Sequence, residues 1–155
     1  MKTTQILALF VCIILIAVCG ITDAGEMNLN IEVPLPDDIK IAAPAEDVPK
    51  GIAAFSGMWE GKQIGGGPAA ALVVEEINSK EAKVIYCRGK RSDYYGPTPA
   101  YCHRYKAIVT PENLQIEFGH SEKNWFTFSM ENNLEQMKGT HKASWVTEFI
   151  MTKIK

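Results

Sequence analysis

The sequence predicts an all-β protein built as an eight-stranded antiparallel up-and-down barrel. From Gly57 to the C-terminus, short runs rich in β-branched and aromatic residues alternate with turn residues, at the spacing of a β-sandwich or barrel. No stretch in this region has room for a crossover helix, so successive strands are expected to pair as antiparallel hairpins. Eight strands can close into a barrel whose interior is filled by side chains or holds one small ligand, and closure leaves no exposed edge.

The strands are expected in order along the chain, each ended by a recognisable turn. A triple-glycine and proline break follows the first strand, and Gly89–Ala100 is the longest loop. The other turns carry Asn, Ser, Pro, Glu or Gly, which favour reversals of the backbone. The expected strands are Gly57–Ile64, Ala70–Ile77, Ala82–Arg88, Tyr101–Val109, Leu114–Phe118, Trp125–Met130, Leu134–Thr140 and Ser144–Ile154.

The first 24 residues are expected to be a secretory signal peptide, which predicts a periplasmic or secreted protein. Lys2 supplies a positive start, Ile6–Ile21 is apolar, and Thr22–Ala24 offers small residues for cleavage. Cys19 sits in a segment resembling a lipoprotein box, although Val18 replaces the usual small residue. Cys19 is therefore either an ordinary apolar residue or a lipidation site, which would anchor the domain to a membrane without spanning it.

Residues 25–50 are expected to form an extended, mobile linker, and residues 51–155 the barrel domain. The linker contains four prolines and several carboxylates, and its apolar residues follow no sustained period. Pro49–Phe55 is expected to form one helical turn, with proline near its start and Gly57 just beyond its end. Such a turn could plug one end of the barrel.

The charge balance excludes a strongly basic or acidic protein. The chain has 16 Lys and Arg residues against 18 Asp and Glu residues, a formal net charge of −2. A balance this close to neutral gives no strong field for nucleic acid or anionic lipid, so no nucleic-acid partner is expected.

Cys87 and Cys102 are the two cysteines outside the N-terminal segment. In an exported protein an even pair indicates one disulfide, and two free thiols are the alternative. Side-chain alternation places Cys87 on the same face as Lys83, and Cys102 on the same face as Arg104. The two cysteines are therefore expected on the charged outer faces of adjacent strands, where a disulfide clamps the base of the Gly89–Ala100 loop.

The same alternation turns a set of aromatic side chains into the barrel. Up-and-down topology also brings the longer loops and all three histidines to the end opposite Trp59, where barrels commonly bind ligands. The last strand is expected to point Trp145, Thr147, Phe149 and Met151 inward. The expected ligand-binding residues are Tyr86, Tyr101, His103, Tyr105, Phe118, Trp125, Trp145 and Phe149.

The triplet Gly57-Met58-Trp59, on the first of eight meander strands, resembles the opening of the lipocalins and the wider calycin group. The resemblance covers residues 51–155 and implies that Trp59 packs across the closed end of the barrel, against a basic residue of the last strand. Lys153 takes that position here, where arginine is usual. The Thr-Asp-Tyr loop of true lipocalins would fall near residues 131–133 and is absent, so the resemblance is to an outlying, lipocalin-like barrel. The chain is also similar to small exported bacterial domains whose Trp-x-Gly start precedes a Leu-Val-Val-Glu strand and which have no assigned activity.

The sequence favours a non-catalytic barrel that binds a small apolar or amphipathic molecule and needs no cofactor. Aromatic rings would supply buried surface, and tyrosine hydroxyls a few polar contacts. The alternative is an accessory or interaction module whose filled barrel contacts another protein or an envelope component. A third hypothesis is a metal-dependent enzyme using His103, His120 and His141, since imidazole is a common zinc and iron ligand. The spacing of these histidines matches no recognised metal motif, and no metal ligand is assigned from it.

Overall fold

The structure is a computed structural model that describes residues 33–93 and 96–154. The expected signal peptide, Cys19 and the first part of the linker lie outside these described residues, as do Tyr94 and Tyr95. Export, lipidation and the domain boundaries therefore stay predictions.

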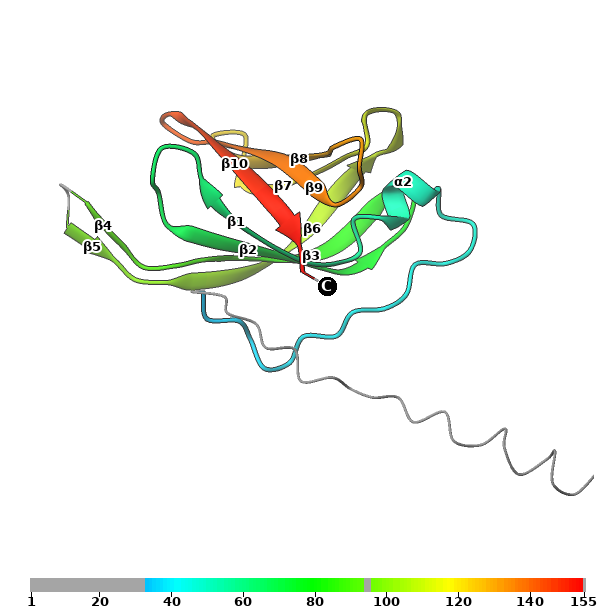
Figure 1. The fold of residues 1–155 in the computed structure, drawn as a ribbon, viewed down its shortest axis with the longest axis horizontal. Coiled ribbons are helices and arrows are strands. Elements are labelled where there is room, and N and C mark those ends of the chain that lie inside the picture. Colours follow the sequence, from blue (N-terminus) through cyan, green and yellow to red (C-terminus); the bar gives the residue numbers. More distant parts are fainter. Residues whose placement is uncertain (1–32, 94–95, 155) are drawn as a thin grey trace, which may run out of the picture. The chain divides into compact units, whose positions relative to one another are not determined.

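Eight strands form one closed antiparallel barrel, in the order β1-β10-β9-β8-β7-β6-β3-β2 (Figure 1). This architecture confirms the all-β, eight-stranded fold class. The strands follow the chain around the barrel, and β1 closes it by pairing with β10. The barrel strands are β1 (Gly57–Gln63), β2 (Ala69–Ile77), β3 (Glu81–Arg88), β6 (Tyr101–Thr110), β7 (Gln115–Ser121), β8 (Asn124–Met130), β9 (Gln136–Lys142) and β10 (Val146–Lys153).

The segment expected as one long loop, Gly89–Ala100, contains a small hairpin. Its strands β4 (Arg91–Asp93) and β5 (Gly96–Thr98) pair antiparallel and project beyond β3 and β6 (Figure 1). The strands β7 and β9 start later than expected, because Leu114 and Leu134 have positive φ angles of 47° and 58°. A left-handed backbone cannot continue a ladder, so β7 and β9 begin only after these residues.

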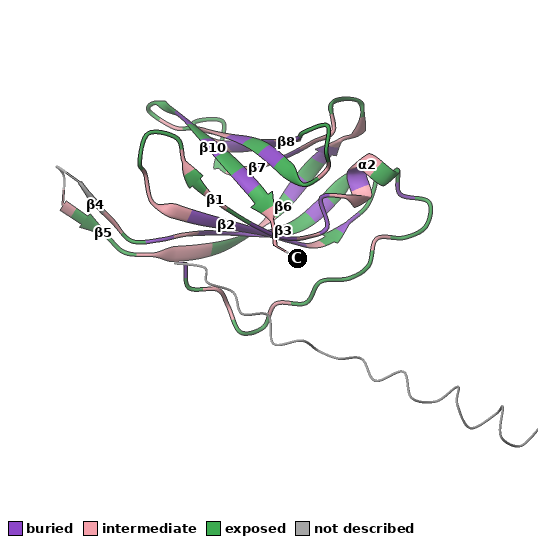
Figure 2. Ribbon diagram, in the orientation of Figure 1, coloured by how far each residue is buried: buried purple, intermediate pink, exposed green. Residues whose placement is uncertain are grey.

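Buried and exposed side chains alternate along the strands, and this identifies the face that lines the core. On β10, Thr147, Phe149 and Met151 are buried, whereas Val146 and Ile150 are exposed (Figure 2). The three buried residues confirm the expected register of the last strand.

Trp59 is fully buried at the closed end of the barrel and pairs with Lys153 in the β1–β10 register. The Lys153 ammonium lies 5.2 Å from the centre of the Trp59 ring and donates a 2.8 Å hydrogen bond to the Ala54 carbonyl. Trp59 Nε1 in turn donates to the Phe55 carbonyl at 2.8 Å. Burial lowers the pKa of Lys153 from its usual value. The Trp59–Lys153 contact implied by the resemblance is therefore present.

A single helical turn, α2 (Lys50–Ala53), covers the same end of the barrel. Ile52 within the turn and Phe55 just after it are fully buried in the core. The bonds from Trp59 and Lys153 to the carbonyls of Phe55 and Ala54 attach this turn to the first and last strands. The turn acts as the plug expected from the sequence.

The middle of the barrel is filled by the protein's own aromatic side chains. Phe118 stacks with Phe126 and Phe128 at centroid distances of 5.2 and 5.8 Å. Phe128 lies over Gly139, where a Cβ atom would come within 2.4 Å of the ring. The Phe128 ring fits in this layer because the paired residue on the neighbouring strand β9 is a glycine, which leaves space for the ring.

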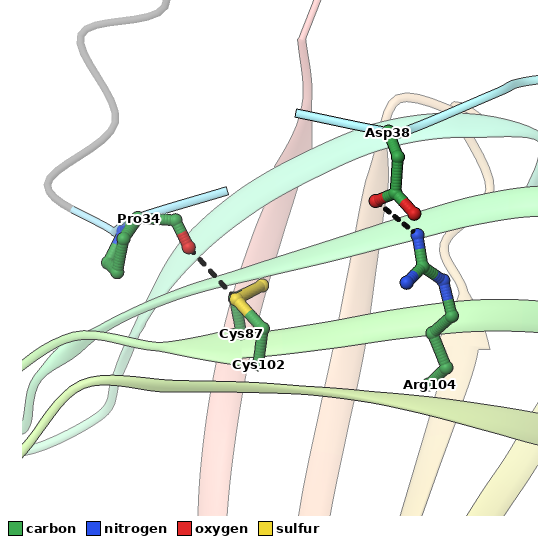
Figure 3. The surroundings of a disulfide bond; sticks show 5 residues. All are labelled: Pro34, Asp38, Cys87, Cys102 and Arg104. Carbon is green, nitrogen blue, oxygen red and sulfur yellow. Dashed lines mark hydrogen bonds and ion pairs between the residues drawn. A yellow bond between two sulfur atoms is a disulfide. The ribbon is translucent and has the colours of Figure 1, made fainter. Parts of the chain in front are cut away.

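Residues 33–48, here called the outer strap, run along the outside of the barrel. Ala42 donates a backbone hydrogen bond to the Glu75 carbonyl at 2.8 Å, and Arg104 pairs with Asp38 at 2.6 Å (Figure 3). Outward residues of β2 and β3, among them Val73 and Ile85, are fully buried. Because both faces of β2 are covered, its sequence is a continuous run of apolar residues rather than an alternating pattern.

Cys87 and Cys102 form the expected disulfide and lie directly opposite each other on β3 and β6. The Pro34 carbonyl oxygen of the outer strap lies 2.9 Å from Cys102 Sγ (Figure 3). A disulfide sulfur has no hydrogen to donate, so this is a close packing contact. The disulfide faces outward as expected, but Cys87 is fully buried.

Candidate functional site

The candidate site is the open end of the barrel, opposite Trp59 and α2. Here β1, β3, β6, β7 and β9 send polar and aromatic side chains inward above the filled core. This group, called the mouth below, consists of Gln63, Tyr86, Arg88, Tyr101, His103, Tyr105, His120 and His141.

Tyr86 lies at the bottom of the mouth and joins it to the core. Its ring is 4.4 Å from that of Phe126 and 6.2 Å from that of Phe118. Its hydroxyl group is buried and makes no hydrogen bond. Burial raises the pKa of Tyr86, Tyr101 adds to the increase, and the positive charge of Arg88 opposes it. Tyr86 is therefore a neutral phenol with an unused donor aimed into the barrel.

Arg88 lies two residues further along β3, on the same inward face as Tyr86. Its Nη2 donates to Gln63 Oε1 at 3.3 Å, while its Nε is buried without a partner. Among the described residues no ion pair joins a carboxylate to Arg88. A buried cationic donor of this kind is costly unless another group accepts from it.

Three side chains from β6 and one from β7 form the aromatic wall of the mouth. The Tyr105 hydroxyl lies 3.0 Å from His120 Nε2, within hydrogen-bond distance. The His103 ring is 5.2 Å from that of Tyr101 and 5.6 Å from that of His120. Both histidines are exposed, so the ring edges and faces of this wall are accessible from solvent.

His141 lies on the opposite wall, stacked on Phe126 with ring centroids 4.1 Å apart. Its Nε2 is 2.7 Å from Asn124 Oδ1, which can only accept, so Nε2 carries the hydrogen. Burial lowers the pKa of His141 from its usual value, and the charge of Arg88 lowers it further. Neutral His141 is the form that this site favours.

The His141 contacts predict that the folded protein loses stability as the pH falls below about 6.5. Because its folded pKa is lowered, the unfolded chain binds a proton there before the folded chain does. The stability that neutral His141 contributes is complete above the pKa of His141 in the unfolded chain. It is lost as the pH falls through the lower pKa of His141 in the folded protein. Urea unfolding midpoints between about pH 7.5 and about pH 5 measure the effect, and His141→Gln should flatten this profile. An equally steep profile in His141→Gln would contradict the assignment.

The mouth contains only some of the residues expected from the sequence to bind a ligand. Tyr86, Tyr101, His103 and Tyr105 line it, whereas Phe118 and Phe149 are buried in the filled core below. Whether any of them binds a ligand stays a prediction.

Two tryptophans lie away from the interior. Trp125 packs on the outer surface over Gly119 and donates from Nε1 to Glu117 Oε2 at 3.4 Å. Trp145 is 58% exposed and is therefore not part of the buried interior. It lies in a turn in which Ala143 N donates a hydrogen bond to Trp145 O, and β10 begins only at Val146.

The expected ligand-binding residues omit Arg88 and His141. Arg88 ends the expected strand Ala82–Arg88 and shares the parity of Tyr86, so alternation alone could have placed it on the inward face. The sequence pattern offers His141 only as a metal ligand together with His103 and His120. Within residues 33–93 and 96–154, no group of three or more His, Cys, Asp or Glu side chains is arranged to hold a metal.

The outer surface also has a groove of about 660 Å³ between the outer strap and strands β2, β3 and β6. Its rim carries the ion pairs Lys83–Glu76 and Lys106–Glu81. Because these charges pair with each other, the groove lacks the unsatisfied buried groups found in the mouth.

No family model and no curated protein matches this chain. In the part of the chain that the structure describes, no helix is long and apolar enough to cross a membrane. The site must therefore be interpreted from its geometry: a closed barrel with a filled core, and an open mouth that combines aromatic rings with unsatisfied donors.

Proposed function

We propose that this is a non-catalytic, exported, lipocalin-like barrel that binds a small amphipathic molecule in its mouth. The observation that carries the proposal is the unpartnered Tyr86 hydroxyl at the bottom of an aromatic cup. Buried polar groups in proteins nearly always have a partner, so the Tyr86 hydroxyl is a donor that a ligand entering the open end can satisfy. The filled core below limits any ligand to the mouth, which favours a small molecule.

The aromatic wall supports an apolar contribution to binding. Tyr101, His103, Tyr105 and His120 present accessible rings on one side. Apolar burial against such rings is the main source of affinity in ligand pockets, while a few polar groups orient the ligand. The Tyr105 ring also packs against the buried Phe118 ring, with the ring centroids 4.9 Å apart. This contact holds the wall in place, so little reordering is needed on binding.

The test uses an uncharged fluorescent probe, N-phenylnaphthylamine, titrated into the purified protein. We expect a saturable rise in fluorescence that weakens by about threefold to tenfold in His103→Ala, because a lost ring contact costs about 0.5–1.5 kcal/mol. Ile108→Ala is the matched control, since Ile108 is an exposed residue on the outer face of the same strand. Absence of saturable binding, or equal weakening in the control, would refute binding in the mouth.

A second candidate function is an interaction module, and an exposed apolar patch favours it. Ile64, Trp145 and Val146 are exposed beside the open end, and Ile150 in the middle of β10 is exposed on the same strand as Val146. Lys138, opposite Ile150 in the strand register, pairs with Glu148. The patch is therefore suited to apolar contact with an envelope component.

This second candidate is tested by co-sedimentation with anionic lipid vesicles, using Trp145→Ser against the same Ile108→Ala control. We expect Trp145→Ser to reduce the bound fraction if the patch docks on lipid, because exposed tryptophan inserts at interfaces. Equal sedimentation of both variants and the wild type would remove this candidate without affecting the mouth.

A further inference from the structure

The mouth of the barrel contains a positive charge without a matching negative one. The inward-facing charged or titratable groups there are Tyr86 and Arg88 on β3, Tyr101, His103 and Tyr105 on β6, His120 on β7 and His141 on β9. None of them is a carboxylate. The acidic residues of the adjoining strands, Glu60, Glu117 and Glu148, alternate onto the outer face. The mouth is thus cationic although the whole chain carries a net charge of −2.

Two unused donors belong to successive inward-facing residues of β3 in this cationic region. Arg88 Nε and the Tyr86 hydroxyl are both buried without a partner. Their residues are one strand repeat apart on the same face, about 6–7 Å along β3, so a compact group can contact both. A guanidinium only donates, and the phenol donates when an acceptor is offered. The pair therefore matches an acceptor with at least two oxygen atoms.

The surroundings favour a charged acceptor over a neutral one. Beside the effect of burial, the positive charge of Arg88 acts to lower the pKa of both Tyr86 and His141. Gln63 is the one described partner of the guanidinium, and its amide oxygen offers no compensating charge. Hydrogen bonds from a cation to an anion are about twice as strong as neutral ones.

We propose that Arg88 and Tyr86 form a subsite for an anionic head group, a carboxylate or a sulfonate, on the amphipathic molecule that the proposed function places in the mouth. The head group accepts from Arg88 Nε and the Tyr86 hydroxyl. The apolar part of the ligand lies against the rings of Tyr101, His103 and Tyr105. This inference rests on the proposed function and specifies the chemistry of its ligand.

The experiment compares two probes that share one fluorophore. Anilinonaphthalenesulfonate carries a sulfonate, whereas N-phenylnaphthylamine is uncharged. We expect the wild type to bind the sulfonate probe more tightly, and Arg88→Met to weaken the sulfonate probe by about 10-fold to 100-fold while leaving the neutral probe within about twofold. Arg104→Gln is the matched control, because it removes an arginine from the outer face of β6.

Tyr86→Phe provides a second variant in case Arg88→Met fails to fold. The Tyr86 hydroxyl has no partner in the protein, so its removal should leave the thermal midpoint unchanged or higher. Affinity for the sulfonate probe should nevertheless fall by about threefold to tenfold. A residue with a purely structural role would not separate stability from binding in this way.

The outcomes distinguish this inference from the proposed function. If neither probe binds, the proposed function itself fails. If the neutral probe binds but the wild type shows no preference for the sulfonate, a water molecule suffices for the two donors and the anion subsite is wrong. Equal weakening of the sulfonate probe in Arg88→Met and Arg104→Gln would also overturn the subsite, because the effect would then be general electrostatics.

Discussion

Replacing Trp59 with alanine is expected to lower the free energy of unfolding by about 3–5 kcal/mol, the usual cost of truncating a fully buried large aromatic side chain. Trp59 is fully buried, and its indole donates to the Phe55 carbonyl while Lys153 lies over its ring. The substitution leaves a cavity between the first and last strands, where the barrel closes, and also releases α2. Urea unfolding followed by circular dichroism measures the loss.

Trp59→Phe separates the contributions made by Trp59. It keeps most of the apolar volume but removes the Nε1 donor and leaves the Phe55 carbonyl without that bond. We therefore expect a smaller loss, of about 1–3 kcal/mol. If Trp59→Ala lost less than about 1 kcal/mol, the closed end would not be the anchor of the barrel.

Removing the Cys87–Cys102 disulfide is expected to cost about 3 kcal/mol of stability, the loop-entropy value for a bridge closing about 15 residues. The two cysteines are separated by 15 positions, and the loop between them contains the β4–β5 hairpin. The bridge joins β3 to β6, the two strands that carry most of the mouth. Unfolding midpoints in urea, measured with and without reductant, give the effect.

The double variant Cys87→Ala with Cys102→Ala is the control for reduction. It should match the reduced wild type and show no response to reductant. Alanine is preferred to serine because Cys87 is fully buried, where a serine hydroxyl would lack a partner. A wild type that unfolds at the same urea concentration with and without reductant would contradict a stabilising role for the bridge.

The barrel itself was predictable because its causes are local. Alternation with a period of two identifies the inward face of each strand, and it correctly assigned Tyr86, Phe118 and Phe149 to the interior. Short turns force neighbouring strands to pair, so the order of strands around the barrel follows from the order along the chain. The disulfide followed from the same reasoning, since the two cysteines share the parity of charged outward residues.

The candidate site was less predictable because it depends on strand ends. Alternation holds only where a residue belongs to a strand, and Trp145 falls in a turn just before β10. Arg88 occupies the last position of β3, as the expected strand Ala82–Arg88 has it, but alternation does not show whether a side chain at a strand end is buried. One position decides whether such a residue joins the mouth or faces solvent.

Periodicity and the pairing of neighbouring strands predicted the closed β-barrel and its cross-strand disulfide, and the resemblance of Gly57-Met58-Trp59 to the lipocalin opening implied the anchor at Trp59. Three features come only from packing: the core is filled, Cys87 and Ile85 are buried on the outward face of β3, and Tyr86 and Arg88 carry unused donors on its inward face. These features depend on volumes and contacts between residues far apart in the chain. No local pattern encodes whether rings from four strands leave a cavity or close it.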